Sequence, residues 1–471
     1  MNSNLKFKEK ASYGLGAVGK DMVYALSATY ILYYYQDLLG INALYMGIIL
    51  LCARIFDALN DPIMGVIVAK TKTRWGKFRP WLLVGTLLNS VFLILMFSVP
   101  SQVTGSGLVA WAAVMYIMWG VTYTMMDIPY WSMVPAFTQG GKERENLSAL
   151  ARSCAGVGSA LIQIFTMTIV YILGRIGASG EIANSVVELN GFRYLAIAVA
   201  VIFIAFTLIC CINIKEKSTV NMQTASLGQM FKALIQNDQA MVIVIAIVCV
   251  NTAFYTTSNL LIYFFKYDFG GENWYNSYTL FNTFGGGMQI LSMMLLFPLL
   301  RKFFNTIKLF KISLTSAILG YVVLLIISFF SMSNVFILFI PAFFIFTALG
   351  ILTVLTTIFL ANTVDYGHVK NGRRDESVIF SMQTFVVKLA SGISALIASI
   401  CLYVFSISSN TDTEVVASLS QTSVTGLRMT MTILPMLGLF IAMYVFRHKY
   451  ILTDEKIKEL ETEIKNRGLN D

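Results

Sequence analysis

The stretch 44-LYMGIILLCARIFDALNDPIMGVIVA-69 is apolar enough to cross a membrane, yet it carries two aspartates near its centre. A spanning helix needs roughly 20 apolar residues. A carboxylate at membrane depth costs about 2.5–3.5 kcal/mol on insertion scales, so such a residue usually has a function there. Asp57 and Asp61 lie four residues apart, which puts both carboxylates on one face of a helix, with Asn60 beside them. Two carboxylates and an amide predict a cation site inside a membrane protein.

The rest of the chain has the composition of a membrane protein. Of its 471 residues, 57% are apolar and 13% are charged, whereas a soluble domain is about 25% charged. Twelve apolar segments, centred near residues 27, 55, 90, 118, 160, 203, 252, 288, 321, 347, 390 and 436, take up most of the length. We therefore expect an all-α membrane protein with twelve transmembrane helices in two six-helix bundles. The sequence has no Ser/His/Asp set, Cys/His cluster or glycine-rich phosphate loop, so we expect neither an enzyme nor a bound cofactor.

Lysine and arginine gather in alternate polar segments. Residues 70–80 hold five of them and residues 301–311 hold four. The segments predicted on the opposite side hold only Arg175, Arg193, Lys266 and Arg428. This positive-inside bias predicts a multi-pass protein of the inner (plasma) membrane with both termini in the cytoplasm. It also explains the net charge of +9 by topology in a lipid bilayer, without nucleic acid as a partner.

The polar stretch Lys215–Gln239 divides the predicted spans into six and six. We predict an N-terminal bundle over residues 1–214, a central cytoplasmic loop over 215–239, a C-terminal bundle over 240–446 and a cytoplasmic tail over 447–471. In the tail, Asp454–Asn466 is polar and helix-forming, and we assign it no chemistry. A layout of six and six spans is typical of major facilitator transporters, whose substrate site lies between the halves near the middle of the bilayer.

Eight ionisable side chains fall within the predicted spans, and positive and negative charges balance. They are Lys20, Asp21, Arg54, Asp57, Asp61, Asp127, Arg152 and Lys388. Buried charges need partners, so we expect these side chains to face one another across a polar cavity. Any single pair could instead only hold two helices together. Their spread over five spans favours a transport pathway.

The fourth predicted span carries a stripe of polar and aromatic residues. Tyr123, Asp127 and Trp131 recur every four residues, with Thr124 next to Tyr123. A carboxylate accepts hydrogen bonds from sugar hydroxyls, and an aromatic ring suits the apolar face of a pyranose. Trp131 could instead be an interfacial belt residue near the helix end.

The eleventh predicted span adds a lone lysine in an apolar helix. Thr384 and Lys388 share a face, with Gln383 beside it. We expect Lys388 to pair with Asp57, Asp61 and Asp127, which would link a cation site to a substrate site. Arg152 of the fifth span could donate to sugar hydroxyls or a carboxylate, or pair with Asp21 or Asp127.

The predicted cation ligands are hard oxygens. Coupling to protons needs only one carboxylate, so the neutral oxygens of Asn60 and Thr124 favour Na⁺ as co-substrate, with Li⁺ and H⁺ as alternatives. Ca²⁺ takes six to eight oxygen ligands, more than this span offers.

Six stretches match a known family: 18-VGKDMVYALSATYILYYYQD-37, 53-ARIFDALNDPIMG-65, 73-TRWGKFRPWLLVGTLLNSV-91, 119-WGVTYTMMDIPYWSMVP-135, 364-VDYGHVKNGRRDES-377 and 382-MQTFVVK-388. The chain resembles the glycoside–pentoside–hexuronide:cation symporters of the major facilitator superfamily, and most of all the melibiose carrier branch. The resemblance implies a cation site of Asp57, Asn60, Asp61 and Thr124. It implies that the sugar is surrounded by Lys20, Asp21, Asp127, Trp131, Arg152, Gln383, Thr384 and Lys388.

Three positions depart from the melibiose branch. Thr353 stands where tryptophan is usual, Asn362 where aspartate is common, and His368 where glutamate often follows. The first bears on the sugar pocket and the other two on gating, which we assign to Lys70–Arg79 and Asp365–Arg374.

The expected function is import of an α-galactoside such as melibiose with Na⁺, by alternating access in a monomer. The alternatives are a symporter for another glycoside, a pentoside or a hexuronide. A lysophospholipid symporter is a more distant alternative.

Overall fold

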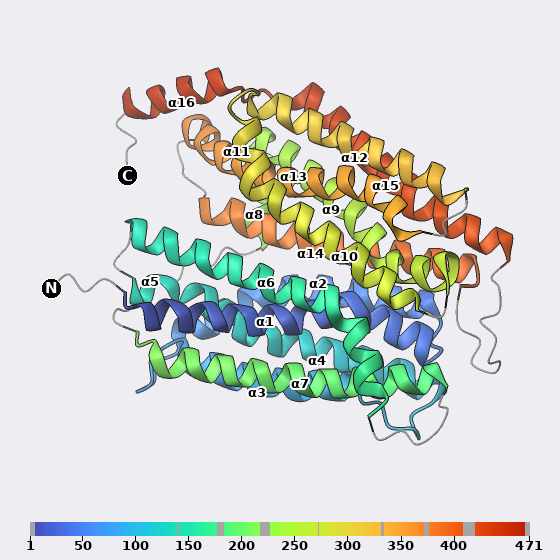
Figure 1. Ribbon diagram of the computed structural model, residues 1–471. Helices are drawn as coiled ribbons and strands as arrows, with labels where there is room; N and C mark the ends of the chain where they lie inside the picture. The colour runs from blue at the N-terminus through green and yellow to red at the C-terminus, as the bar shows by residue number, and fades with distance from the viewer. Residues whose placement is uncertain are drawn as a thin grey trace. The chain divides into compact units, whose positions relative to one another are not determined.

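The computed structural model describes residues 5–138, 141–176, 183–216, 227–271, 273–330, 334–371, 376–407 and 420–466. Within these ranges every regular element is a helix (Figure 1). The chain divides into two compact units, one holding helices α1 to α7 and the other holding α8 to α16. The predicted all-α fold class is confirmed.

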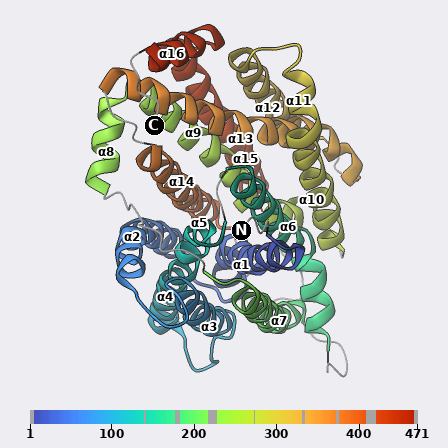
Figure 2. The same ribbon diagram turned by 90° about the vertical axis from the view of Figure 1, so that its left-hand side faces the viewer.

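The first unit is an antiparallel bundle of long helices. Its elements are α1 (Phe7–Tyr33), the π-helical turn η1 (Tyr34–Leu38), α2 (Ala43–Lys70), α3 (Arg79–Met96), α4 (Gly105–Ser132), α5 (Val134–Phe137), α6 (Gly141–Gly174) and α7 (Asn184–Asn213). Helix α1 packs against α6 and α7, while α3 packs against α4 and α7 (Figures 1 and 2). Helix α2 packs mainly on α4 and hardly touches α1.

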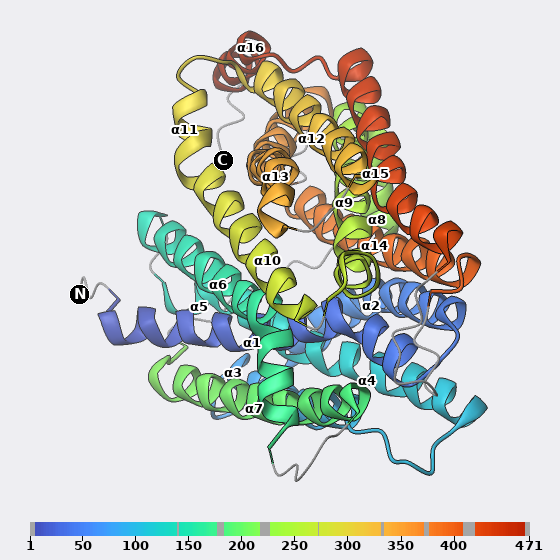
Figure 3. The same cartoon turned by 45° about the vertical axis from the view of Figure 1, so that its right-hand side comes forward.

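The second unit repeats this plan with more interrupted helices. Its elements are α8 (Leu227–Gln236), α9 (Asp238–Tyr263), η2 (Phe264–Phe269), α10 (Trp274–Leu291), η3 (Ser292–Leu296), α11 (Phe297–Leu300), α12 (Thr306–Ser328), α13 (Val335–Asn371), α14 (Glu376–Val404), α15 (Gln421–Lys449) and α16 (Asp454–Asn466). Helix α9 packs between α14 and α15, and α13 packs against α10 and α12. In Figure 3 the segments α10, η3 and α11 follow one another as a continuous rod.

Eleven helices of the described part are long and apolar enough to cross a membrane. The first predicted span is α1, which has 27 residues but also carries Lys20, Asp21 and four tyrosines that lower its mean hydropathy. Large apolar side chains such as Ile63 and Ile172, 59% and 63% exposed, face outward, as contact with lipid requires.

Two details differ from the predictions made from the sequence. The predicted central loop contains a helix, α8, and α9 begins before that loop was expected to end; residues 217–226 lie outside the described part. Of the four basic residues assigned to outer loops, only Arg175 lies outside a helix or π-helical turn. In the tail, α16 covers the predicted range, and residues 467–471 lie outside the described part.

A pair of tyrosines joins α1 to α4 next to the polar residues of both helices. The rings of Tyr13 and Tyr130 stack with centroids 4.4 Å apart. Each hydroxyl donates to the backbone carbonyl of the other residue, at 2.7 and 2.5 Å. Because buried phenols need hydrogen-bond partners, this reciprocal contact fixes the position of α4 along α1.

Candidate functional site

Lys20 of α1 is the centre of a charged cluster in the first unit. Its Nζ lies 2.8 Å from a carboxylate oxygen of Asp21 and 2.8 Å from one of Asp127 on α4. It also donates to the hydroxyl of Tyr123 at 3.3 Å. The lysine is buried, whereas the side chains of Asp21 and Asp127 are 20% and 28% exposed. The ammonium therefore holds two carboxylates that a ligand can still reach.

Aromatic rings complete this cluster. Lys20 Nζ lies 5.0 Å from the ring centroid of Trp131 and 5.7 Å from that of Tyr130, distances typical of cation–π contacts. The indole N–H of Trp131 donates to Asp127 at 3.1 Å. The guanidinium of Arg152 also lies over the Trp131 ring, 4.1 Å from its centroid. Trp131 thus belongs to the charged cluster, and Arg152 uses its ring as a partner.

A second cluster joins α2 to α1 and α4. Arg54 lies 3.2 Å from Asp57, and both side chains are buried. The guanidinium carbon lies 5.4 Å and 5.8 Å from the ring centroids of Tyr24 and Tyr116. The other carboxylate oxygen of Asp57 faces the backbone of Gly120, where a Cβ would come within 2.5 Å of it. Arg54 is therefore the buried ion-pair partner of Asp57, a pairing that was not predicted from the sequence.

The remaining predicted cation ligands lie one turn further along α2. Thr124 of α4 donates its hydroxyl to Asp61 at 3.1 Å, so the two predicted ligands meet. Asn60 is half-buried, and its Nδ2 has no hydrogen-bond partner within the described residues. The described part contains no group of three or more histidine, cysteine or acidic side chains that could hold a metal ion. The four predicted ligand side chains are fewer than the six to eight oxygen ligands that Ca²⁺ takes.

The second unit carries the other predicted sugar contacts. On α14, Gln383 and Lys388 are half-buried and Thr384 is exposed. Because these residues belong to the second unit, pairing of Lys388 with the aspartates of the first unit stays a prediction. Thr353 on α13, one of the departures from the melibiose branch, is exposed and its hydroxyl donates to the carbonyl of Leu349 at 2.8 Å.

The sequence analysis did not predict the burial of two further carboxylates. Glu188 on α7 is 1% exposed and accepts hydrogen bonds from the hydroxyls of Tyr33 and Tyr171. Asp268 of η2 accepts two hydrogen bonds from the guanidinium of Arg428 on α15, from Nε at 2.7 Å and from Nη2 at 2.5 Å. These residues sit near helix ends, where hydropathy alone assigns polar side chains to loops. They tie helices together inside each unit.

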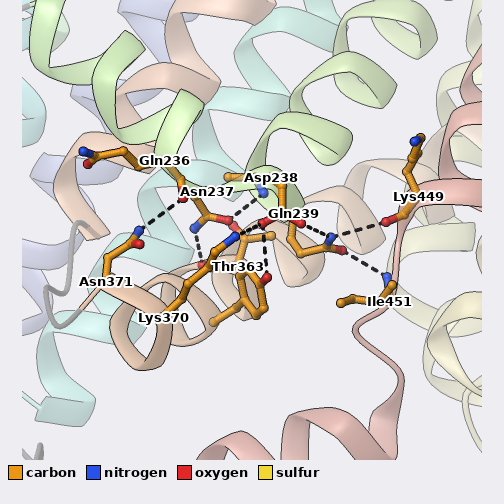
Figure 4. A network of polar contacts seen from close by, with 11 residues as sticks. Gln236, Asn237, Asp238, Gln239, Thr363, Lys370, Asn371, Lys449 and Ile451 are labelled. Atoms are coloured by element: carbon orange, nitrogen blue, oxygen red, sulfur yellow. Dashed lines mark hydrogen bonds and ion pairs between the residues drawn. The ribbon is translucent and has the colours of Figure 1, made fainter.

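A polar network joins the start of α9 to α13 and to the end of α15 (Figure 4). Asn237 donates to the carbonyl of Thr363 at 2.7 Å, and Lys370 pairs with Asp238 at 2.5 Å. Gln239 accepts from the backbone N–H of Ile451 at 3.0 Å. Lys370 of the predicted gate segment is thus engaged inside the second unit. Arg373 and Arg374 of that segment lie outside the described residues.

A family model described as MFS/sugar transport protein matches residues 12–454. The chain is 27% identical to a lactose permease of Lactobacillus delbrueckii subsp. bulgaricus, over 97% of this chain and 73% of the permease. It is also 27% identical to a glucuronide carrier protein homolog of Escherichia coli, over 99% of this chain and 97% of that protein. A solved structure of a variant of the nucleoside transporter NupG aligns with a TM-score of 0.64 at 13% identity, covering 94% of this chain and 100% of the other, which is a likeness of fold.

Proposed function

The chain belongs to the MFS/sugar transport family as a glycoside–pentoside–hexuronide:cation symporter, and from this premise we propose that it imports an α-galactoside such as melibiose together with Na⁺ by alternating access. It is a multi-pass membrane transporter of sugars and not an enzyme. We also propose that the protein is a monomer in the inner membrane with both termini in the cytoplasm. The observation that carries it is the cluster of Lys20, Asp21, Asp127 and Trp131.

The chemistry of this cluster supports a neutral sugar. Asp21 and Asp127 each keep part of their carboxylate exposed, and carboxylates accept strong hydrogen bonds from hydroxyls. The indole of Trp131 beside them offers an apolar surface for the C–H groups of a pyranose. With Lys20 and Arg152 included, the formal charges cancel, so an uncharged ligand leaves no net charge in the site. We propose that Tyr123 on α4, and Gln383, Thr384 and Lys388 on α14, complete the sugar contacts.

The proposed cation ligands are Asp57, Asn60, Asp61 and Thr124. The hydrogen bond between Thr124 and Asp61 supports this assignment, because it brings a hydroxyl and a carboxylate from two helices together. We propose Na⁺ as the preferred ion, with Li⁺ or H⁺ as alternatives. A cation that binds here would hold α2 against α4, the helix that also carries Asp127.

The test is counterflow of labelled melibiose into vesicles containing the transporter, with Na⁺, Li⁺ or neither. We expect Na⁺ to give the largest exchange. The variant Asp61→Cys should bind sugar without any gain from Na⁺, while Asp454→Asn, on α16 in the second unit, should behave as wild type. If sodium still raises the sugar affinity of Asp61→Cys, the cation assignment is wrong.

One observation favours a second substrate class. The side chain of Arg152 is exposed, and its guanidinium lies over the ring of Trp131. In this position the guanidinium could pair with the carboxylate of a hexuronide. Competition against labelled melibiose by glucuronides, pentosides, other galactosides and a lysophospholipid separates the possibilities. Stronger competition by a glucuronide that is lost in Arg152→Gln would replace the galactoside assignment.

A further inference from the structure

The loop between α2 and α3 is held by the carboxylate of Glu216, three residues after the end of α7. Lys77, Phe78 and Arg79 each donate their backbone N–H to Glu216, at 2.6, 3.0 and 3.1 Å. Such N–H groups at the start of a helix have no partner within the helix. They carry partial positive charge, so a carboxylate is well suited to bind them. Glu216 therefore caps α3 across a separation of more than 130 residues in the sequence.

The loop is shaped to receive this carboxylate. Gly76 has a φ of +109°, a conformation that other residues rarely adopt. A Cβ at Gly76 would lie 2.3 Å from a carboxylate oxygen of Glu216. The turn before it is closed by the hydroxyl of Thr73, which donates to the carbonyl of Gly76 at 2.6 Å. Glycine is thus required here both by the backbone and by the closeness of Glu216.

The loop matters because it ends the helix that carries the proposed cation ligands. Helix α2 packs mainly on α4, whereas α3 packs on both α4 and α7. Near the end of α2, the indole of Trp81 on α3 donates to the hydroxyl of Thr71 at 2.8 Å. From there the loop continues to the three N–H groups held by Glu216. These contacts connect the end of α2 to α3 and α7.

We propose that Glu216 is a positioning residue for transport. Its carboxylate latches the loop of residues 71–79 to the segment that follows α7. The latch fixes the end of α2, and so the position at which Asp57 and Asp61 of α2 meet α4. The latch itself does not depend on the proposed function. Its effect on cation binding rests on the proposed cation site.

Hydrogen–deuterium exchange of the full-length protein tests the latch directly. In Glu216→Ala the amides of residues 77–79 should exchange at least about tenfold faster, because hydrogen bonds to a charged group are lost. Potassium formate, which supplies a small carboxylate, should restore protection in this variant, whereas potassium chloride should not. The matched control is Glu9→Ala, which removes an exposed carboxylate that caps the backbone N–H of Lys6 at 2.8 Å. It should leave the exchange of residues 77–79 unchanged.

Unchanged exchange in Glu216→Ala, or faster exchange that formate does not slow, would overturn the latch. If the alanine variant does not fold, Glu216→Gln provides the test: its amide fits the same space without charge, and protection equal to wild type would also overturn the latch.

Sugar binding with and without Na⁺ tests the positioning role. We expect the gain in sugar affinity from Na⁺ to shrink in Glu216→Ala and to recover in formate. If residues 77–79 exchange faster in Glu216→Ala but Na⁺ raises its sugar affinity as much as in the wild type, the positioning role is overturned and the latch stands. If the wild type shows no sodium effect, the proposed function fails, and the exchange result still decides the latch.

Discussion

Replacing Lys20 by methionine removes the cation that Asp21 and Asp127 share. Lys20 is 3% exposed, and its Nζ lies 2.8 Å from each carboxylate. Methionine keeps an apolar stem of similar length and removes the charge. We expect the variant to bind sugar more weakly and to unfold at a lower temperature, because two carboxylates are then left facing each other.

The magnitude follows from the geometry. Since each carboxylate oxygen lies 2.8 Å from the same nitrogen, the two are at most about 5.6 Å apart, and at an effective dielectric of about 20 they repel by about 3 kcal/mol. The side chains of Asp21 and Asp127 are 20% and 28% exposed, so water and ions screen part of this repulsion. About 2 kcal/mol remains, and it corresponds to about a 30-fold loss of sugar affinity if the sugar must bring the carboxylates back together.

Calorimetric titration of the purified protein with sugar, alongside thermal unfolding, measures both effects. The control is Lys8→Met, the same change on the same helix at an exposed position. The double variant Lys20→Met with Asp127→Asn should regain stability, because the repulsion is gone, but not affinity. If Lys20→Met binds sugar and unfolds as wild type does, then Lys20 does not hold the two carboxylates in place and the reasoning is refuted.

Three further predictions concern other contacts. Asp268→Asn should lower the free energy of unfolding by about 3 kcal/mol, because it leaves the guanidinium of Arg428 without its buried counter-charge; a thermal melt equal to wild type would contradict this. Gly120→Ala should abolish the effect of Na⁺ on sugar binding while some sugar binding remains, since the new methyl group would displace Asp57; calorimetry with and without Na⁺ would show a preserved effect if the contact is unimportant. Asn237→Ala should destabilise the protein by about 2 kcal/mol in thermal unfolding, because the cap of α9 and a hydrogen bond to α13 are both lost, and a change within error would argue against the network.

The sequence predicts the helices well because membrane spans impose a simple requirement of length and hydropathy. Each of the twelve predicted segments corresponds to a long helix in the structure. Helical spacing also places Asp57 and Asp61 on one face, and the contact from Thr124 to Asp61 agrees with that reading. The helix α8 inside the central loop was missed because a ten-residue amphipathic helix resembles a polar linker in hydropathy.

Pairing between charges was harder to predict. The sequence identifies many of the buried charges but not every partner, because some partners come from a different helix. Lys20 was predicted to lie beside the sugar, which stays a prediction, and the structure adds that it is the buried counter-ion of Asp21 and Asp127. Arg54 and Asp57 lie three residues apart on α2, so helical spacing could have predicted this pair. The pairing of Lys20 on α1 with Asp127 on α4 is not visible in spacing along one helix.

Packed side chains connect the proposed cation site to the proposed sugar site within the first unit. Tyr24 lies against Arg54, the partner of Asp57, and its ring centroid is 5.4 Å from that of Tyr123, which accepts a hydrogen bond from Lys20. Tyr123 and Thr124 are adjacent on α4, so a cation that shifts Thr124 would also shift Tyr123. Energetic coupling needs such a chain of packed groups that both ligands bias. The series of contacts through Tyr24 and Tyr123 does not include Lys388, which the sequence analysis expected to link the two sites. Sodium should therefore still raise sugar affinity in Lys388→Gln, and should do so less in Tyr24→Ala, because only the second variant breaks the packed contact between the clusters.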